Sequence, residues 1–214
     1  MHELDAQTAY WDAAGETKTF AHPLNLDRFG GLVSQDAAIL DYGCGYGRLC
    51  AELVARGYRH VTGVDISAGM IERGSTLFPD LDLRRITGRV LPFAAETFDA
   101  CLLFAVLTCI PTDAGQQEVI AELGRVLRAG GILYVSDYPL QTDARNQDRY
   151  RTWAWVCGRF GVFRLPDGAT LRHHDMRWIH ALLDVFDVLH EDVLAVRTMN
   201  GNLAQAFQIL ARKQ

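Results

Sequence analysis

Short apolar runs alternate with longer stretches in which apolar residues recur every three or four positions, and this alternation continues from residue 38 to residue 137. Runs of the first kind are typical of buried strands, and stretches of the second kind are typical of amphipathic helices. The run 98–104 is almost wholly apolar, which is expected of a strand covered by helices on both faces. Strands alternating with helices predict a parallel, doubly wound α/β sheet. The predicted strands are 38–42, 60–65, 82–86, 98–104 and 132–137.

Residues at the ends of the helical stretches support these boundaries. Gly57 follows the stretch after the first strand, where a glycine favours the end of a helix. Ser67 is a suitable N-cap for the next helix, and Pro79 lies just beyond its end. Thr112 opens a further helix before the strand 132–137. These boundaries predict helices between the parallel strands.

The last third of the chain has a different pattern. Aromatic residues and arginines dominate residues 138–163, and a Pro-Asp-Gly sequence at 166–168 predicts a hairpin turn, so we expect an insertion here. Residues 188–197 and 203–211 alternate as strands do, and the Asn-Gly pair between them predicts an antiparallel hairpin. Before that hairpin a helix is predicted from about Asp175, with an apolar face formed by Ile179, Leu182, Leu183 and Phe186.

Composition narrows the class of protein. The chain has 214 residues, of which 49% are apolar and 22% charged, so it can bury a globular core and is not disordered. Its net charge of −5 argues against a nucleic-acid partner. The longest apolar stretch, 100–110, is too short to span a membrane, and the polar N-terminus lacks the apolar core of a signal peptide. The five cysteines include no C-x-x-C pair, so we expect buried free thiols, no metal and a cytoplasmic location.

A glycine-rich loop with the pattern Asp41-x-Gly43-x-Gly45-x-Gly47 follows the first predicted strand. Glycines let the backbone turn sharply and approach a ligand, and the next helix offers unpaired N–H groups at its N-terminus. Ligands of open α/β sheets bind beyond the carboxyl ends of the strands, near the point where the strand order reverses. Asp65 ends the second strand, where its carboxylate can accept hydrogen bonds from ribose hydroxyls. The loop therefore predicts a nucleotide-like ligand.

Four motifs, in order, resemble those of the class I S-adenosylmethionine-dependent methyltransferases. The glycine loop is similar to motif I of that family, and residues 64–67 with Met70 are similar to its ribose motif. Residues 91–99 resemble the approach to the fourth strand, and residues 123–133 resemble the helix, glycine turn and fifth strand. The resemblance implies a Rossmann-like, seven-stranded sheet of order 3-2-1-4-5-7-6 with the last strand antiparallel. It also implies an N-terminal helical cap and an insertion between strand 5 and the last helix.

This resemblance implies a single methyltransferase domain with four segments. They are an N-terminal cap (1–37), a cofactor-binding core (38–137), a substrate-lid insertion (138–174), and the last helix with the C-terminal hairpin (175–214). The implied cofactor is S-adenosyl-L-methionine, which becomes S-adenosyl-L-homocysteine, and no metal is expected. The expected partner is a small-molecule substrate, with neither nucleic acid nor membrane, and the expected state is a monomer or homodimer.

The family's cofactor site is carried onto this chain residue by residue. The resemblance implies that Asp41 orients the loop and the bound amino group, that Asp65 holds the ribose hydroxyls, and that Met70 packs near the adenine. Relatives often carry an acidic or amide residue after the glycine that corresponds to Gly88, but Arg89 stands there, so nearby main-chain groups are expected to replace that contact. The expected set is Asp41, Gly43, Cys44, Gly45, Asp65, Ile66, Met70, Arg89, Val90 and Phe104.

The acceptor site is predicted from the chemistry of the reaction. Methyl transfer from a sulfonium is an in-line displacement, so the protein mainly has to align the reactants and exclude water. An oxygen or protonated nitrogen acceptor benefits from a general base, and His173 and His174 lie in the expected lid. The alternative is a surface hairpin with two exposed imidazoles. For a flat small molecule we expect a pocket formed by Tyr10, Trp11, Phe20, Tyr138 and Trp153.

Other functions stay open on the sequence. A non-catalytic partner or regulatory subunit of an active methyltransferase can share this fold, but the intact glycines and Asp65 argue against that role. A protein substrate is also open. An NAD-dependent oxidoreductase needs a third glycine three residues after Gly45, where Arg48 stands. We expect methyl transfer to a nitrogen or oxygen atom of a small aromatic or heterocyclic molecule.

Overall fold

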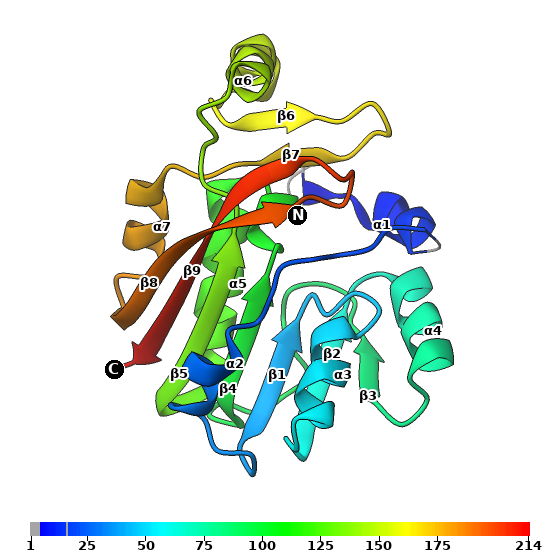
Figure 1. The fold of residues 1–214 in the computed structure, drawn as a ribbon, viewed down its shortest axis with the longest axis vertical. Coiled ribbons are helices and arrows are strands. Elements are labelled where there is room, and N and C mark those ends of the chain that lie inside the picture. Colours follow the sequence, from blue (N-terminus) through cyan, green and yellow to red (C-terminus); the bar gives the residue numbers. More distant parts are fainter. Residues whose placement is uncertain (1–4, 16) are drawn as a thin grey trace.

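A computed structural model describes residues 5–15 and 17–214. One central sheet contains β1 (Ala38–Tyr42), β2 (His60–Asp65), β3 (Asp82–Arg85), β4 (Phe98–Phe104), β5 (Leu127–Asp137), β8 (Phe186–Arg197) and β9 (Leu203–Lys213). Its strand order is β3-β2-β1-β4-β5-β9-β8 (Figure 1). The first five strands pair in parallel, whereas β9 is antiparallel to both β5 and β8. The predicted seven-stranded order is confirmed.

Helices cover both faces of the sheet. Because successive side chains of a strand point to opposite faces, neighbouring residues of β1 belong to different buried clusters. Ile39 shares a cluster with Leu53 of α3, and Leu40 shares the other with Leu123 of α5. The helices of the sheet are α3 (Arg48–Ala55), α4 (Ala68–Leu77), α5 (Asp113–Val126) and α7 (Met176–Leu182). Ser67, Thr112 and Asp175 cap α4, α5 and α7 with their side chains.

The N-terminal part forms the expected helical cap. It contains α1 (Thr8–Ala14) and α2 (Leu26–Gly30), joined by a chain segment that crosses the carboxyl ends of the central strands (Figure 1). The amide of Gly69 at the start of α4 donates a hydrogen bond to Asp12 of α1 over 3.4 Å. Phe29 of α2 is fully buried beside Tyr134 of β5. The two helices are thus anchored at separate places on the core.

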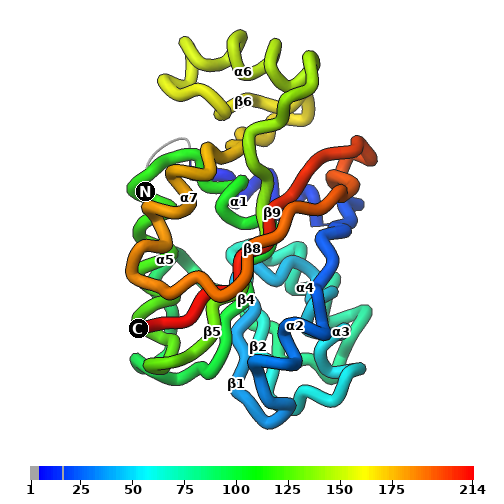
Figure 2. Tube along the Cα trace, turned by 60° about the vertical axis from the view of Figure 1, so that its left-hand side comes forward, coloured from blue at the N-terminus to red at the C-terminus, as the bar shows by residue number. Residues whose placement is uncertain are grey.

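Residues 138–174 form a separate layer above the sheet. They contain α6 (Ala144–Cys157) and the antiparallel pair β6 (Val162–Arg164) and β7 (Thr170–Arg172), which lie together beyond the carboxyl ends of the strands in both views (Figures 1 and 2). His174 returns the chain to the core, because its amide donates a hydrogen bond to the carbonyl of Tyr138 over 2.9 Å. The predicted insertion and its hairpin are confirmed.

Three details differ from the sequence prediction. Helix α6 was not predicted, because it buries only Asn146 and Tyr150 and leaves Trp155 95% exposed, so it has no apolar stripe. Strand β5 begins at Leu127 rather than at residue 132, and its register against β4 shifts at the glycines, between the pairs Phe98–Leu127 and Ala100–Ile132. Helix α7 ends at Leu182, and Phe186 begins β8 instead of completing the apolar face of the helix.

The thiols differ in their burial. Cys44, Cys50 and Cys101 are buried as expected, but Cys109 and Cys157 are half-buried, and all five are free. None of the helices in residues 5–15 and 17–214 has the length and apolar character needed to cross a membrane.

Leu102 provides a test of the core. It lies at the centre of β4 and is fully buried. Leu102→Ala removes several buried methyl groups and leaves a cavity, so we expect the free energy of unfolding to fall by about 2–5 kcal/mol, measured by urea denaturation. Val90, which is 83% exposed, is the matched control, and Val90→Ala should change stability by less than about 0.5 kcal/mol. Equal losses in the two variants would contradict this packing.

Candidate active site

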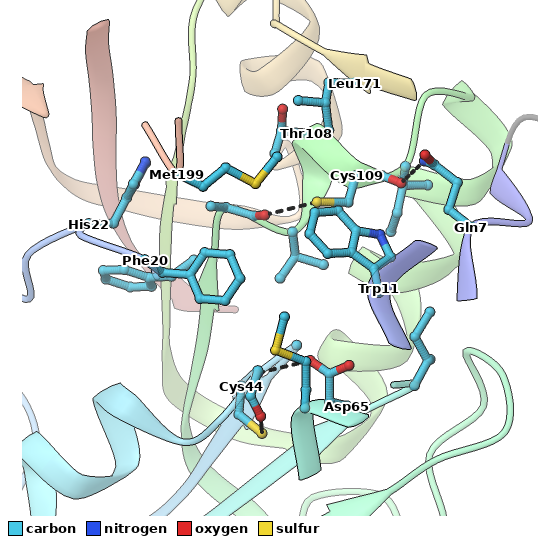
Figure 3. A pocket seen from close by; sticks show the side chains of 18 of the residues that line it. Gln7, Trp11, Phe20, His22, Cys44, Asp65, Thr108, Cys109, Leu171 and Met199 are labelled. Atoms are coloured by element: carbon cyan, nitrogen blue, oxygen red, sulfur yellow. Dashed lines mark hydrogen bonds between the residues drawn. The ribbon is translucent and has the colours of Figure 1, made fainter. Parts of the chain in front are cut away.

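A cavity of about 450 Å³ lies where the glycine loop, the N-terminal cap and the insertion meet. Figure 3 shows Asp65 and Cys44 at one end, Trp11 and Phe20 on the walls, and His22 and Met199 toward the other end. These residues come from β2, the glycine loop, the cap and the turn between β8 and β9. The position agrees with the general rule that ligands of open α/β sheets bind where the strand order reverses, which here is at β1.

The glycine loop approaches the cavity with backbone that only glycine adopts readily. Gly43 and Gly45 have φ values of +72° and +57°. A Cβ atom at Gly43 would collide with Cγ2 of Val106, and one at Gly45 would lie 3.2 Å from the ring of Phe20. The loop is held to β2, because the amides of Gly43 and Cys44 donate to the carbonyl of Val64 over 2.8 and 3.0 Å. A cavity wall without side chains results, as a closely bound ligand requires.

Asp65 occupies the end of β2 with its carboxylate at the cavity. The carboxylate accepts hydrogen bonds from the amides of Gly45 and Ser67, each over 2.8 Å. Burial raises the pKa of Asp65 above its ordinary value, and these backbone hydrogen bonds oppose that shift. The amides orient the carboxylate at the predicted ribose position.

Asp41 lies behind the glycine loop and is fully buried. Burial raises the pKa of Asp41 to about 7, while the thiol of Cys50, which donates a hydrogen bond to Oδ2 over 3.5 Å, lowers it. Asp41 therefore carries only part of a charge near neutral pH. Its carboxyl supports the loop from below and is one of the cavity-lining groups.

His22 is a cavity residue to which the sequence assigned no role in the site. Its ring packs edge-on against Tyr138, and its Nδ1 lies 2.9 Å from Oγ of Ser136. Nε2 is buried and has no hydrogen-bond partner among the described residues. Burial lowers the pKa of His22 to about 4, with Arg48 adding to the shift and Asp137 opposing it. The imidazole is therefore neutral at pH 7.

The two histidines of the insertion are separated by the structure. His173 lines the cavity, whereas His174 does not and packs into the core with Nε2 3.6 Å from Oδ1 of Asp137. Both side chains are buried, so the alternative of two exposed imidazoles is wrong. Burial lowers the pKa of His173 well below its ordinary value, and Arg149 adds to that shift. Alternation along the chain explains why adjacent residues face different surroundings.

Most residues of the two predicted sets line the cavity. The nine from the cofactor set are Asp41, Gly43, Cys44, Gly45, Asp65, Ile66, Met70, Arg89 and Phe104, and those from the substrate set are Trp11, Phe20 and Tyr138. The guanidinium of Arg89, however, is engaged in ion pairs with Asp5 and Glu118, over 2.8 and 2.6 Å. The backbone and the aliphatic part of the Arg89 side chain therefore remain available to a ligand.

Three other expected residues lie outside the cavity lining. Val90 is exposed and outside the cavity lining, because its side chain points into solvent. Tyr10 packs its ring against Trp11, and its hydroxyl donates to Asp167 over 3.1 Å. Trp153 lies on α6 under the guanidinium of Arg164 and does not reach the cavity. Each aromatic ring is used to pack the cap or the insertion, which is a common alternative to ligand contact.

Residues of three segments line the cavity without having been expected there. Arg145 and Arg149 come from α6, Thr108 and Cys109 follow β4, and the third segment is the turn 198–202. Only the two arginines carried a signal in the sequence, since their spacing of four places them on one face of a helix. This spacing is informative only once the segment is known to be helical, and the sequence did not predict α6.

Similarity to known proteins agrees with this geometry. Residues 40–135 match a family model described as "Methyltransferase domain". The ubiquinone biosynthesis O-methyltransferase of Alkalilimnicola ehrlichii is 34% identical over 207 residues, which cover 92% of this chain and 77% of that protein. The 27-O-demethylrifamycin SV methyltransferase of Amycolatopsis mediterranei is 30% identical over 139 residues, covering 61% of this chain and 50% of that protein.

A crystal structure of a SAM-dependent methyltransferase from Methanosarcina mazei has a TM-score of 0.82 and 26% identity, covering 87% of this chain and 96% of that one. The fold, the glycine loop and the similar proteins together identify the class of this protein as a methyltransferase. The chain belongs to the class I S-adenosylmethionine-dependent methyltransferases. It spans half or less of the length of several other curated relatives, such as the rifamycin enzyme at 50%, so the class and not the substrate follows from the likeness.

The neutral state of His22 predicts a dependence of stability on pH. An unfolded chain binds a proton at this imidazole near pH 6.5, whereas the folded chain does so only near pH 4. The free energy of unfolding should therefore fall as the pH drops from about 6.5 to about 4, with a contribution from His22 of up to about 3 kcal/mol. Urea titrations at several pH values measure this fall.

The His22→Gln variant isolates the contribution, since glutamine takes up no proton. Its stability should decline less steeply over that pH range than the stability of the wild type. His60→Gln changes an exposed histidine of β2 and serves as the control. Identical slopes in the wild type and His22→Gln would show that the imidazole is not held neutral.

Proposed function

We propose that this protein transfers a methyl group from S-adenosylmethionine to an oxygen or nitrogen atom of a small aromatic or heterocyclic molecule. One observation carries the proposal. A single cavity joins the glycine loop and the Asp65 carboxylate at one end to aromatic walls and a lid at the other. Such a cavity can hold a nucleoside-bearing cofactor and a small acceptor together, shielded from water.

The residues at the glycine-loop end of the cavity suit the cofactor. The bare backbone at Gly43 and Gly45 leaves room for its methionine part, and the Asp65 carboxylate is oriented to accept hydrogen bonds from two ribose hydroxyls. Met70 is buried below the loop and offers an apolar surface to a base. When bound, S-adenosylmethionine supplies an electrophilic methyl group on a positively charged sulfur.

The residues at the opposite, aromatic end of the cavity suit a small, flat acceptor. Trp11, Phe20 and Tyr138 are aromatic walls, and Leu171 and Met199 add flexible apolar surface. A macromolecular substrate would need an open approach, whereas the cap and insertion enclose this end. Methylation at oxygen is named for the relative from ubiquinone biosynthesis, which supports an oxygen acceptor here.

Proton removal from an acceptor hydroxyl requires a base that is unprotonated at the working pH. His22 is the group that we assign to this role, because it is neutral at pH 7 and its Nε2 has no hydrogen-bond partner among the described residues. His173 is the second imidazole of the cavity. His174 packs away from the cavity, so the predicted role of His174 as a general base has no geometric support.

Calorimetric titration tests the cofactor. We expect S-adenosylmethionine and S-adenosylhomocysteine to bind to the wild type and NAD not to bind. Asp65→Ala should weaken adenosyl binding by about tenfold or more, because two charge-assisted hydrogen bonds are lost. Asp80→Ala, at an exposed position after α4, should bind as the wild type does. Absence of adenosyl binding would contradict the proposed function, and binding of NAD would assign the glycine loop to another cofactor.

Turnover separates the roles of the histidines. With any phenol that the wild type methylates as acceptor, His22→Gln should lower kcat by about 10²-fold or more and leave the affinity for S-adenosylhomocysteine unchanged. His173→Ala should instead raise KM for the acceptor. Unchanged kcat in His22→Gln would remove it as the base, and full turnover in both His173→Ala and His174→Ala would exclude those two residues.

A further inference from the structure

Arg149 projects from α6 into the end of the cavity that the insertion forms. Its guanidinium lies over the ring of Phe163, with Cζ 3.6 Å from the ring centroid, and both side chains line the cavity. A stacked guanidinium keeps its edge free for hydrogen bonds in the plane of the group. The stacking therefore holds the donors of Arg149 in one orientation without using them.

No acidic group of the described residues lies within 4.0 Å of the Arg149 guanidinium. Its Nε is buried and has no hydrogen-bond partner within that part of the chain. Burial lowers the pKa of Arg149 and the neighbouring Arg145 adds to the shift, while Tyr150 and Asp143 oppose it. An arginine stays charged in proteins. A half-buried guanidinium without a carboxylate partner is partly desolvated and uncompensated, so this position is suited to an anion from outside the chain.

Arg145 strengthens the positive potential at this end. It lies one helical turn before Arg149 on α6 and also lines the cavity. Its nearest carboxylate is that of Asp143, at 3.9 Å. By contrast, the acidic residues of the cavity lining are Asp5, Asp41 and Asp65, all at the cofactor end or paired with Arg89. The insertion contributes no acidic side chain to the lining within the described residues.

His173 adds a neutral donor beside Arg149. Oη of Tyr150 accepts a hydrogen bond from the amide of Gln141 over 3.1 Å and lies 2.5 Å from Nδ1 of His173. In the tautomer that the proposal below uses, the phenolic O–H donates to Nδ1 and the single imidazole proton is on Nε2. Phe163 packs against the edge of the same imidazole, with the ring centroids 5.0 Å apart. Arg149 and His173 are therefore held by one buried aromatic cluster.

We propose that the methyl acceptor carries an oxyanion group, a carboxylate or a phosphate, bound by the guanidinium of Arg149 and by Nε2–H of His173. The inference rests on the proposed function, because it concerns the acceptor of that reaction. The planar fork of the guanidinium matches two oxygens of either group. In this arrangement the oxyanion group of the acceptor lies under the insertion, and the aromatic ring of the acceptor extends toward His22.

Three para-substituted phenols test this proposal by calorimetry on the full chain saturated with S-adenosylhomocysteine. They are 4-hydroxybenzoate, 4-hydroxyphenyl phosphate and the neutral 4-hydroxybenzamide. At least one acid should bind about tenfold or more tightly than the amide, because its hydrogen bonds are charge-assisted. The tighter of the two acids identifies carboxylate or phosphate as the natural group.

Variants of α6 assign the preference to Arg149. Arg149→Gln should remove most of the preference for the acid, and Arg149→Lys, which keeps the charge but loses the fork, should retain part of it. Arg151→Gln is the matched control, since Arg151 lies on the same helix with its side chain 66% exposed and paired with Asp148. All three variants should bind S-adenosylhomocysteine as the wild type does.

Several outcomes would overturn the proposal. They are an amide that binds as tightly as both acids, an acid preference that survives Arg149→Gln, an equal loss in Arg151→Gln, and no binding of either acid. The comparison of acid with amide in the wild type needs no variant, so a misfolded Arg149→Gln does not prevent the test. Failure of S-adenosylhomocysteine to bind would instead contradict the proposed function, and the acid preference is then measured on the unliganded chain.

Discussion

The parallel pairing of β1 with β2 on one side and β4 on the other is the constraint on which the rest of the structure depends. The crossovers that follow β2 and β4 leave in opposite directions along the sheet, so the segments after all three strands border one cavity at the carboxyl ends of the strands. The hydrogen bond from the Gly45 amide to Asp65 closes this arrangement. It fixes the glycine loop against β2, and the orientation of the carboxylate follows from that contact.

The cavity above this edge is completed by segments that contact one another as well as the core. Asp167, in the turn between β6 and β7, accepts hydrogen bonds from Tyr10 and Lys18 of the N-terminal cap over 3.1 and 2.9 Å. Lys18 also donates to Asn200 in the turn between β8 and β9 over 2.7 Å. Gln7 exchanges hydrogen bonds with the backbone of Thr170. These polar contacts join the N-terminal cap, the insertion and the turn between β8 and β9 around the cavity.

Charge is distributed unevenly along the cavity, and that distribution gives its two ends different chemistry. The cofactor end contains carboxylates, one held by backbone amides and one behind the loop, where a cofactor with hydroxyl, amino and sulfonium groups is favoured. The insertion end contains the guanidinium groups of Arg145 and Arg149 and the imidazole of His173, and among these only Arg145 has a carboxylate of the described residues within 4.0 Å, that of Asp143 at 3.9 Å. His22 lies between the two, neutral because burial outweighs the attraction of Asp137. A single cavity can therefore orient two different ligands toward each other.

The sequence by itself determined the parts of this protein that depend on local pattern. Apolar periodicity located the strands, spacing of glycines and acids located the loop with Asp65, and the Asn-Gly turn located the last hairpin, since each of these signals acts within a few residues. Only the tertiary structure brought together the residues of the proposed acceptor end. His22, Arg149 and the turn 198–202 are far apart in the chain, and α6 has no apolar stripe to reveal it. Their proximity results from packing between distant segments, which no local pattern encodes, and the same packing turns His174 away from the cavity and His173 into it.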